Sequence, residues 1–192
     1  MSGKIYLEAC PIIDMAEYEA KPSKDREMEV WLCKQALAAA RDERNQIKVY
    51  TSMLSVAECT TIASNLPNPP AETKRFLDML LLSGKSGITI VQIRQIIAIR
   101  ARDLRWASEI NLKGADAIHI ATAIEMKCDE LWTRDGRIWR KRKEIGQLGL
   151  KVIMPQETTV LPENYRNPEL PFSSSQESSS QEFKTRRLLD LS

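Results

Sequence analysis

The chain has few of the histidine and cysteine side chains that bind zinc in proteins. Its 192 residues include one histidine and four cysteines, and Cys10, Cys33, Cys59 and Cys128 form no Cys-x-x-Cys pair. A structural zinc site, which takes about four such ligands, therefore has almost nothing to draw on. We expect the thiols to be free and buried as small apolar groups.

Long hydrophobic runs are missing as well. The longest apolar stretch, residues 88–99, is interrupted by Gln92, Arg94 and Gln95, whereas a membrane span needs about 20 predominantly apolar residues. No segment has the pattern of a signal peptide. We therefore expect a cytoplasmic protein with no membrane partner.

The composition shows no strong excess of charge or of aromatic residues. A net charge of +2 is too small to indicate nucleic-acid binding by itself, and aromatic residues make up 6% of the chain. The apolar content of 43% is ordinary for a packed core. These values indicate one globular domain.

What the chain does have is four carboxylates at the boundaries of four separate segments. Glu8 follows the apolar residues IYL, Glu58 follows LSVA, Asp116 stands in GADAIHIATA, and Asp135 follows LWTR. Acids that converge at about 4 Å repel one another by about 4 kcal/mol per pair at an effective dielectric near 20, unless a cation lies between them. A divalent metal ion is the usual occupant of such a cluster.

The hydrophobic pattern alternates between strands and helices, which favours an α/β fold with a parallel sheet. Strands are expected at 4–7, 47–51, 130–133 and 151–154, and residues 88–91 read as a strand or a helix start. Helices are expected at 24–45, after Ser52 or Ser55, at 71–82, up to about residue 109, and at 114–127. Ligands of such sheets bind at the carboxyl ends of strands, where Glu8 and Asp135 fall. We predict a domain at 1–155 and a disordered Pro/Ser-rich tail at 156–192.

From Lys4 to about Met154 the chain resembles the PIN domains, and among them the VapC-type toxins. The resemblance is carried in order by IYLEA, LSVAE, GADAIHIATA and LWTRD, and the last two motifs are the most specific. It implies a three-layer α/β/α fold whose central parallel sheet presents three or four acids at its carboxyl edge. It also implies a divalent-metal-dependent endoribonuclease that acts on RNA, is held in check by a cognate antitoxin, and is usually a homodimer.

The resemblance implies a role for each acid. Glu8, Asp116 and Asp135 would bind Mg²⁺ or Mn²⁺, Glu58 would complete the catalytic set, and Thr133 would support a carboxylate or a water. Singly, each acid also has a structural reading as a helix-dipole, turn, strand-end or solvated residue. His119 lies one turn beyond Asp116 and is interpreted as a packed helix residue outside the site.

One residue departs from the family pattern, because the first acid is nearly always Asp and here it is Glu8. The longer side chain either shifts the pocket or weakens the site, since Mg²⁺ demands near-ideal octahedral geometry. The alternative function is therefore a PIN fold that binds RNA or protein with reduced or lost catalysis. Asp14 is either a compensating acid or, as we favour, a helix cap or solvated residue.

Basic residues crowd one short stretch around the fourth acid. Arg134, Arg137, Arg140 and Lys141 are candidates for contacts with RNA phosphates, and Trp139 could stack on a base. A solvated helix face with Trp139 in the core is the competing interpretation.

Overall fold

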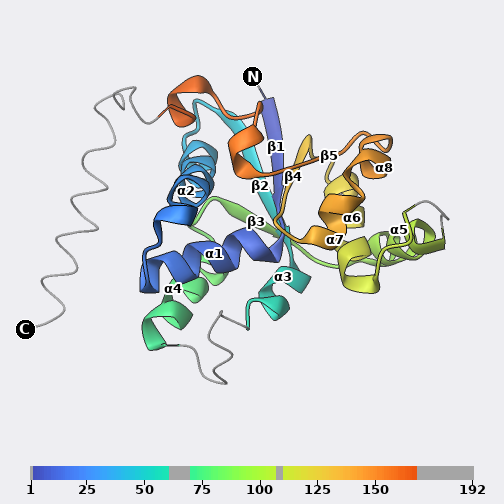
Figure 1. The fold of residues 1–192 in the computed structure, drawn as a ribbon, viewed down its shortest axis with the longest axis horizontal. Coiled ribbons are helices and arrows are strands. Elements are labelled where there is room, and N and C mark those ends of the chain that lie inside the picture. The colour runs from blue at the N-terminus through green and yellow to red at the C-terminus, as the bar shows by residue number, and fades with distance from the viewer. Residues whose placement is uncertain (1, 61–69, 107–109, 168–192) are drawn as a thin grey trace, which may run out of the picture.

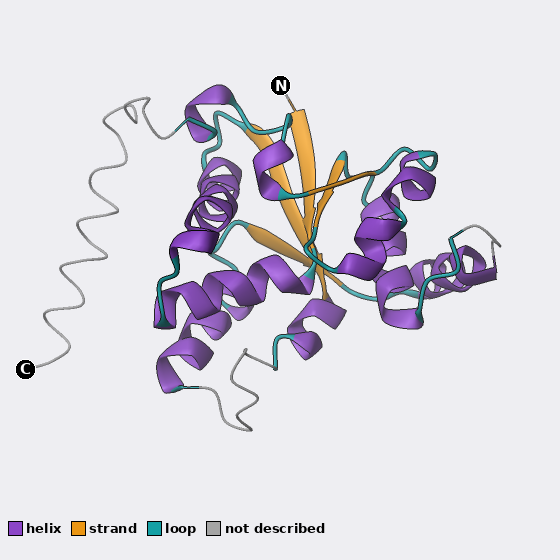
Figure 2. Ribbon diagram, viewed as in Figure 1, coloured by secondary structure: helices purple, strands orange, loops and turns teal. Residues whose placement is uncertain are grey.

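A five-stranded parallel sheet forms the centre of the protein (Figures 1 and 2). The computed structural model describes residues 2–60, 70–106 and 110–167. The sheet has the order β3-β2-β1-β4-β5, and its strands are β1 (Ser2–Leu7), β2 (Gln46–Ser52), β3 (Ile88–Val91), β4 (Glu130–Trp132) and β5 (Lys151–Ile153). The predicted parallel sheet is confirmed, and residues 88–91 form a strand.

Helices cover both faces of this sheet, as Figure 1 shows. One layer contains α1 (Ala9–Ala20), α2 (Glu27–Arg41) and α4 (Ala71–Leu82), and the other contains α5 (Gln95–Trp106), α6 (Gly114–Glu125), α7 (Gly136–Arg140) and α8 (Arg142–Gly146). The short helix α3 (Met53–Glu58) follows β2 at the carboxyl edge of the sheet. The three-layer α/β/α architecture is therefore confirmed.

The strands divide their side chains between two cores, because successive residues of a strand point to opposite faces. In β1, Ile5 and Leu7 pack with the layer of α1, α2 and α4, whereas Tyr6 packs with α5 and α6. All three side chains are 0% exposed. A buried tyrosine in the middle of the central strand brings a hydroxyl group into the interior, and this hydroxyl contributes to the site described below.

The strand order reverses at β1, so the connections that follow β1 and β4 leave the sheet in opposite directions. The chain runs from β1 to β2 and β3 on one side and returns to β4 and β5 on the other. Leu7 of β1 pairs in register with Trp132 of β4, and the amide of Glu8 donates to the carbonyl of Trp132 at 3.2 Å. The residues that follow these two strands therefore emerge side by side, at the position where sheets of this kind bind ligands.

The packed chain extends beyond the predicted boundary at residue 155. Two 3₁₀ turns, Pro155–Glu157 and Glu163–Tyr165, return across the layer of α2. Leu161 and Tyr165 are 1% and 2% exposed within that core. We call residues 155–167 the strap. The sequence missed it because a Pro-rich polar segment has no helix or strand periodicity; residues 168–192 of the predicted tail lie outside the described residues.

One further expectation differs from the structure in detail. The helix expected at 24–45 is divided into a 3₁₀ turn, Lys24–Arg26, and α2, which ends at Arg41. The basic stretch forms the two short helices α7 and α8.

Over the ranges that the structure describes, no helix is both long enough and apolar enough to cross a membrane.

Candidate active site

Glu8 is held at the end of β1 by two hydrogen bonds. As the N-cap of α1, its Oε2 accepts from the amide of Cys10 at 3.0 Å. The same oxygen accepts from the Thr133 hydroxyl at 3.1 Å. The side chain is almost fully buried. Glu8 is therefore fixed in position by its cap and by the neighbouring strand.

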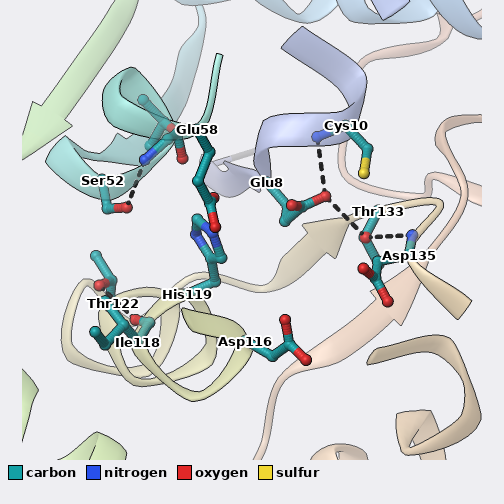
Figure 3. Close-up of polar contacts among 12 residues, drawn as sticks. Glu8, Cys10, Ser52, Glu58, Asp116, Ile118, His119, Thr122, Thr133 and Asp135 are labelled. Carbon is teal, nitrogen blue, oxygen red and sulfur yellow. Dashed lines mark hydrogen bonds and ion pairs between the residues drawn. The ribbon is translucent and has the colours of Figure 1, made fainter. Parts of the chain in front are cut away.

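Thr133 joins Glu8 to Asp135, as the dashed lines in Figure 3 show. While its hydroxyl donates to Glu8, its Oγ1 accepts from the amide of Asp135 at 2.9 Å. Thr133 is 0% exposed. One buried hydroxyl thus connects the Glu8 side chain to the backbone of Asp135, and the supporting role of Thr133 in the site stays a prediction.

Glu58 makes its contact with His119, which sequence reasoning left out of the site. Nε2 of His119 lies 2.7 Å from Oε2 of Glu58, and Nδ1 lies 2.8 Å from the Tyr6 hydroxyl. Burial raises the pKa of Tyr6, so its hydroxyl keeps its proton. A carboxylate oxygen can only accept, so Nε2 is the donor to Glu58. The spacing of three residues from Asp116, which puts both side chains on one face of α6, was the available signal.

Among the four predicted acids, Asp116 is the one with a buried oxygen that has no hydrogen bond in the described residues. It is 4% exposed at the start of α6, and its Oδ2 is buried with no hydrogen-bond partner in the described structure. Burial raises the pKa of this carboxyl; the Arg137 guanidinium opposes the shift, and Asp135 and Glu8 add to it. A buried carboxylate oxygen without a donor is costly, and a bound cation would supply a partner for it.

Arg137 contacts two of the four acids. Its guanidinium lies against both oxygens of Asp135, with Nη2 at 2.8 Å from Oδ2, and the same Nη2 lies 3.2 Å from Oδ1 of Asp116. Asp135 also caps α7 by accepting from the Arg137 amide at 2.6 Å. These hydrogen bonds lower the pKa of Asp135. Asp135 is therefore both a helix cap and half of an ion pair.

The structure brings all four predicted acids to one region at the carboxyl edge of the sheet (Figure 3). Ligand atoms of Glu8, Glu58 and His119 all lie within 4.8 Å of one another, a grouping able to hold a metal ion. The predicted set was Glu8, Asp116 and Asp135. Because Nε2 of His119 carries a proton, the histidine can join a metal only by losing it, whereas Oδ2 of Asp116 needs no such change. The carboxylate oxygens suit a hard divalent ion such as Mg²⁺ or Mn²⁺.

The predicted phosphate contacts have different surroundings. Arg134 pairs with Asp14 and Glu29, Lys141 pairs with Glu144, and Arg140 is exposed on α7. Trp139 packs against the core, with the Arg142 guanidinium 4.7 Å from its ring centre.

Asp14 follows neither interpretation given above. It is buried within α1 and paired with Arg26 and Arg134, so it is neither a cap nor a solvated acid. Its partners explain how it can be buried and charged. We find no contact that would let it compensate for Glu8 in the described residues.

The sequence matches the family model of the PIN domain over residues 30–144, more than half of the chain. The chain belongs to the PIN domain family. The matched range includes Glu58, Asp116 and Asp135, whereas Glu8 precedes it.

Among solved structures, the chain is similar to the crystal structure of FitAcB from Neisseria gonorrhoeae. The two share 19% sequence identity with a TM-score of 0.53, over 80% of this chain and 99% of the other. At this identity the likeness supports the fold alone. No curated protein matches the sequence.

Proposed function

We propose that the protein is a divalent-metal-dependent endoribonuclease that hydrolyses RNA phosphodiester bonds, and that it is the toxin of a toxin-antitoxin pair. The observation that carries the proposal is the unpartnered Oδ2 of Asp116, which is buried among other acids of a PIN domain. An acid cluster held at a sheet edge, with one oxygen unsatisfied, has the chemistry of a cation site. Many PIN relatives are nucleases, and this supports the reaction type.

Each residue then has a part in the reaction. Glu8 and Asp116 would hold Mg²⁺ or Mn²⁺, with Asp135 and Glu58 completing the set, and the bound ion supplies a water of lowered pKa and stabilises charge on the phosphate. Thr133 keeps the Glu8 carboxylate in place through its hydroxyl. Tyr6 and His119 fix the direction of Glu58 through two successive hydrogen bonds.

The partners follow from the same proposal. RNA is the substrate, and the candidates for contacts with its phosphates are Arg137 and Arg140 on α7 and Lys141 at the C-cap of that helix. Arg134 is a weaker candidate because Asp14 and Glu29 already bind it. A cognate antitoxin would cover the acids, and a homodimer is the expected assembly. A neighbouring gene for a small DNA-binding protein would support the toxin assignment.

The second candidate function is a PIN fold that binds RNA or protein without cutting. The specific observation in its favour is that the unusual Glu8 already caps α1 and bonds Thr133. An acid used in this way can be structural alone. The two functions differ in whether the purified protein hydrolyses RNA.

Cleavage of a mixed, structured RNA by purified protein with Mn²⁺, Mg²⁺ or EDTA separates the two. We expect metal-dependent cleavage that falls by about 100-fold or more in Asp116→Asn. Asp78→Asn is the matched control, because Asp78 is exposed on α4. If the native protein is inert while Glu8→Asp cuts, the fold is a nuclease weakened at its first acid. If neither cuts while RNA still binds, the binding function replaces the nuclease.

A further inference from the structure

Arg137 supplies the acid cluster with a positive charge of its own. Its guanidinium forms hydrogen bonds to both oxygens of Asp135 and reaches Oδ1 of Asp116 at 3.2 Å. These acids come from different elements, the N-cap of α7 and the first turn of α6. A planar guanidinium suits such a position because it presents several donors in a fixed fork.

This cation lies where a divalent ion is proposed to bind. Asp116 and Asp135 are two of the three acids in the predicted metal set, and Arg137 engages both. A guanidinium and a divalent ion repel each other at contact distance, and a site of low dielectric strengthens that repulsion. The two cations therefore compete for the same carboxylates.

The exposure of the side chains indicates which group can move. The Arg137 side chain is 48% exposed, whereas those of Asp116 and Asp135 are 5% and 18% exposed. A half-exposed arginine can turn to water with little change in its hydration, whereas the acids are held by the fold. The structure thus has a fixed anionic pocket and a cation at its solvent side.

We infer that Arg137 is the resident counter-ion of the acidic site, and that a divalent metal ion binds by displacing its guanidinium from Asp116 and Asp135. The inference rests on the proposed metal site. It gives Arg137 a role in setting metal affinity, separate from any contact with RNA. In the absence of metal, the same arginine reduces the repulsion between the buried acids.

Mn²⁺ binding without RNA tests the displacement, by calorimetry or by the electron paramagnetic resonance signal of free Mn²⁺. Arg137→Gln keeps hydrogen-bond donors but removes the charge, and we expect it to bind Mn²⁺ about tenfold more tightly than the native protein, a difference of about 1.4 kcal/mol. Arg137→Lys keeps the charge but loses the forked donors of the guanidinium. Its Mn²⁺ affinity should lie between those of the native protein and Arg137→Gln. Arg140→Gln, on the same helix and exposed, should stay within about twofold of the native protein.

Thermal unfolding gives a second readout that does not depend on affinity alone. Without metal, Arg137→Gln should melt at a lower temperature than the native protein, and saturating Mn²⁺ should raise its melting temperature by more. Equal or weaker Mn²⁺ binding in a folded Arg137→Gln would overturn the displacement while leaving the metal site intact. If neither protein binds Mn²⁺, the metal site and the displacement both fail. Should Arg137→Gln not fold, Arg137→Lys decides, because affinity no higher than native contradicts the competition.

Discussion

Glu130 and Asp116 are both buried carboxylates, yet their surroundings differ completely. Glu130, 1% exposed in β4, accepts hydrogen bonds from Trp132 Nε1, from the Thr158 hydroxyl, and from both the amide and the hydroxyl of Thr159. Asp116, 4% exposed, has one oxygen with no partner. Burial therefore does not separate a structural acid from a candidate ligand. What differs between these two acids is the number of satisfied oxygens, since the fold supplies donors to both oxygens of Glu130 and leaves Oδ2 of Asp116 without one.

Removing the satisfied acid should have the largest effect on stability. Glu130→Ala leaves the buried Trp132 and Thr158 donors unpaired, so we expect the free energy of unfolding to fall by about 3 kcal/mol or more. Urea denaturation measures the loss. Glu163→Ala in the exposed part of the strap is the control and should change little. A loss below about 1 kcal/mol for Glu130→Ala would mean that water replaces the lost contacts.

The hydroxyl that joins Glu8 to Asp135 should have an intermediate effect. Thr133→Val preserves the side-chain shape but removes a donor to Glu8 and an acceptor for the Asp135 amide, which we expect to cost about 1–2 kcal/mol. Thr89→Val, exposed on β3, provides the comparison by the same denaturation. Equal stability of the two variants would show that Thr133 is not needed to hold these acids.

Substitution of Asp116 should stabilise the protein, whereas substitution of Glu130 should destabilise it. Asp116→Asn removes a charge that burial and neighbouring acids disfavour, so in EDTA at neutral pH we expect a gain of about 1 kcal/mol, which corresponds to a rise of about 2–4 °C in melting temperature. Calorimetry of this variant beside Asp78→Asn measures it. A fall in melting temperature would show that the charged form of Asp116 stabilises the fold, as we expect for Glu130.

The gain in Asp116→Asn should depend on pH, and this is the smallest effect. The folded pKa of Asp116 is raised above its unfolded value, so the protein loses stability as pH rises from the ordinary aspartate value through the raised one. The amide does not titrate. The difference in melting temperature should therefore be present at neutral pH and shrink below about pH 4. A difference that is constant with pH would assign it to packing rather than to charge.

The fold was predictable because the signals that define it are local. The helix at residues 71–82 is found with the bounds expected from the prolines before it and the Ser-Gly turn after it. Asp116 and Asp135 were identified from short motifs at element boundaries, and the parallel sheet brings those boundaries together. Periodicity and turn residues therefore predicted the layers, and the motifs shared with the PIN domains predicted where the acids would gather.

Contacts between distant segments could not be predicted in the same way. Nothing in the sequence near His119 indicates that Tyr6 and Glu58 will lie on its two sides, since these residues meet only across the assembled sheet. The strap was missed for a similar reason. Thr158 and Thr159 of the strap have the pattern of loop residues in the sequence. Their structural role depends on hydrogen bonds to Glu130 in β4, which the sequence does not indicate.

We expect the strap to affect the order in which the site forms during synthesis. β4 leads directly to Thr133 and Asp135, but its buried Glu130 has most of its donors on residues that the ribosome adds later. A nascent chain that has just finished β5 therefore has the Trp132 Nε1 donor to this carboxylate but lacks those of Thr158 and Thr159. Because domains fold as units, the acidic pocket would acquire its final geometry only after the chain has emerged past the strap, and a ribosome-bound fragment that ends earlier would carry all four acids without a completed site.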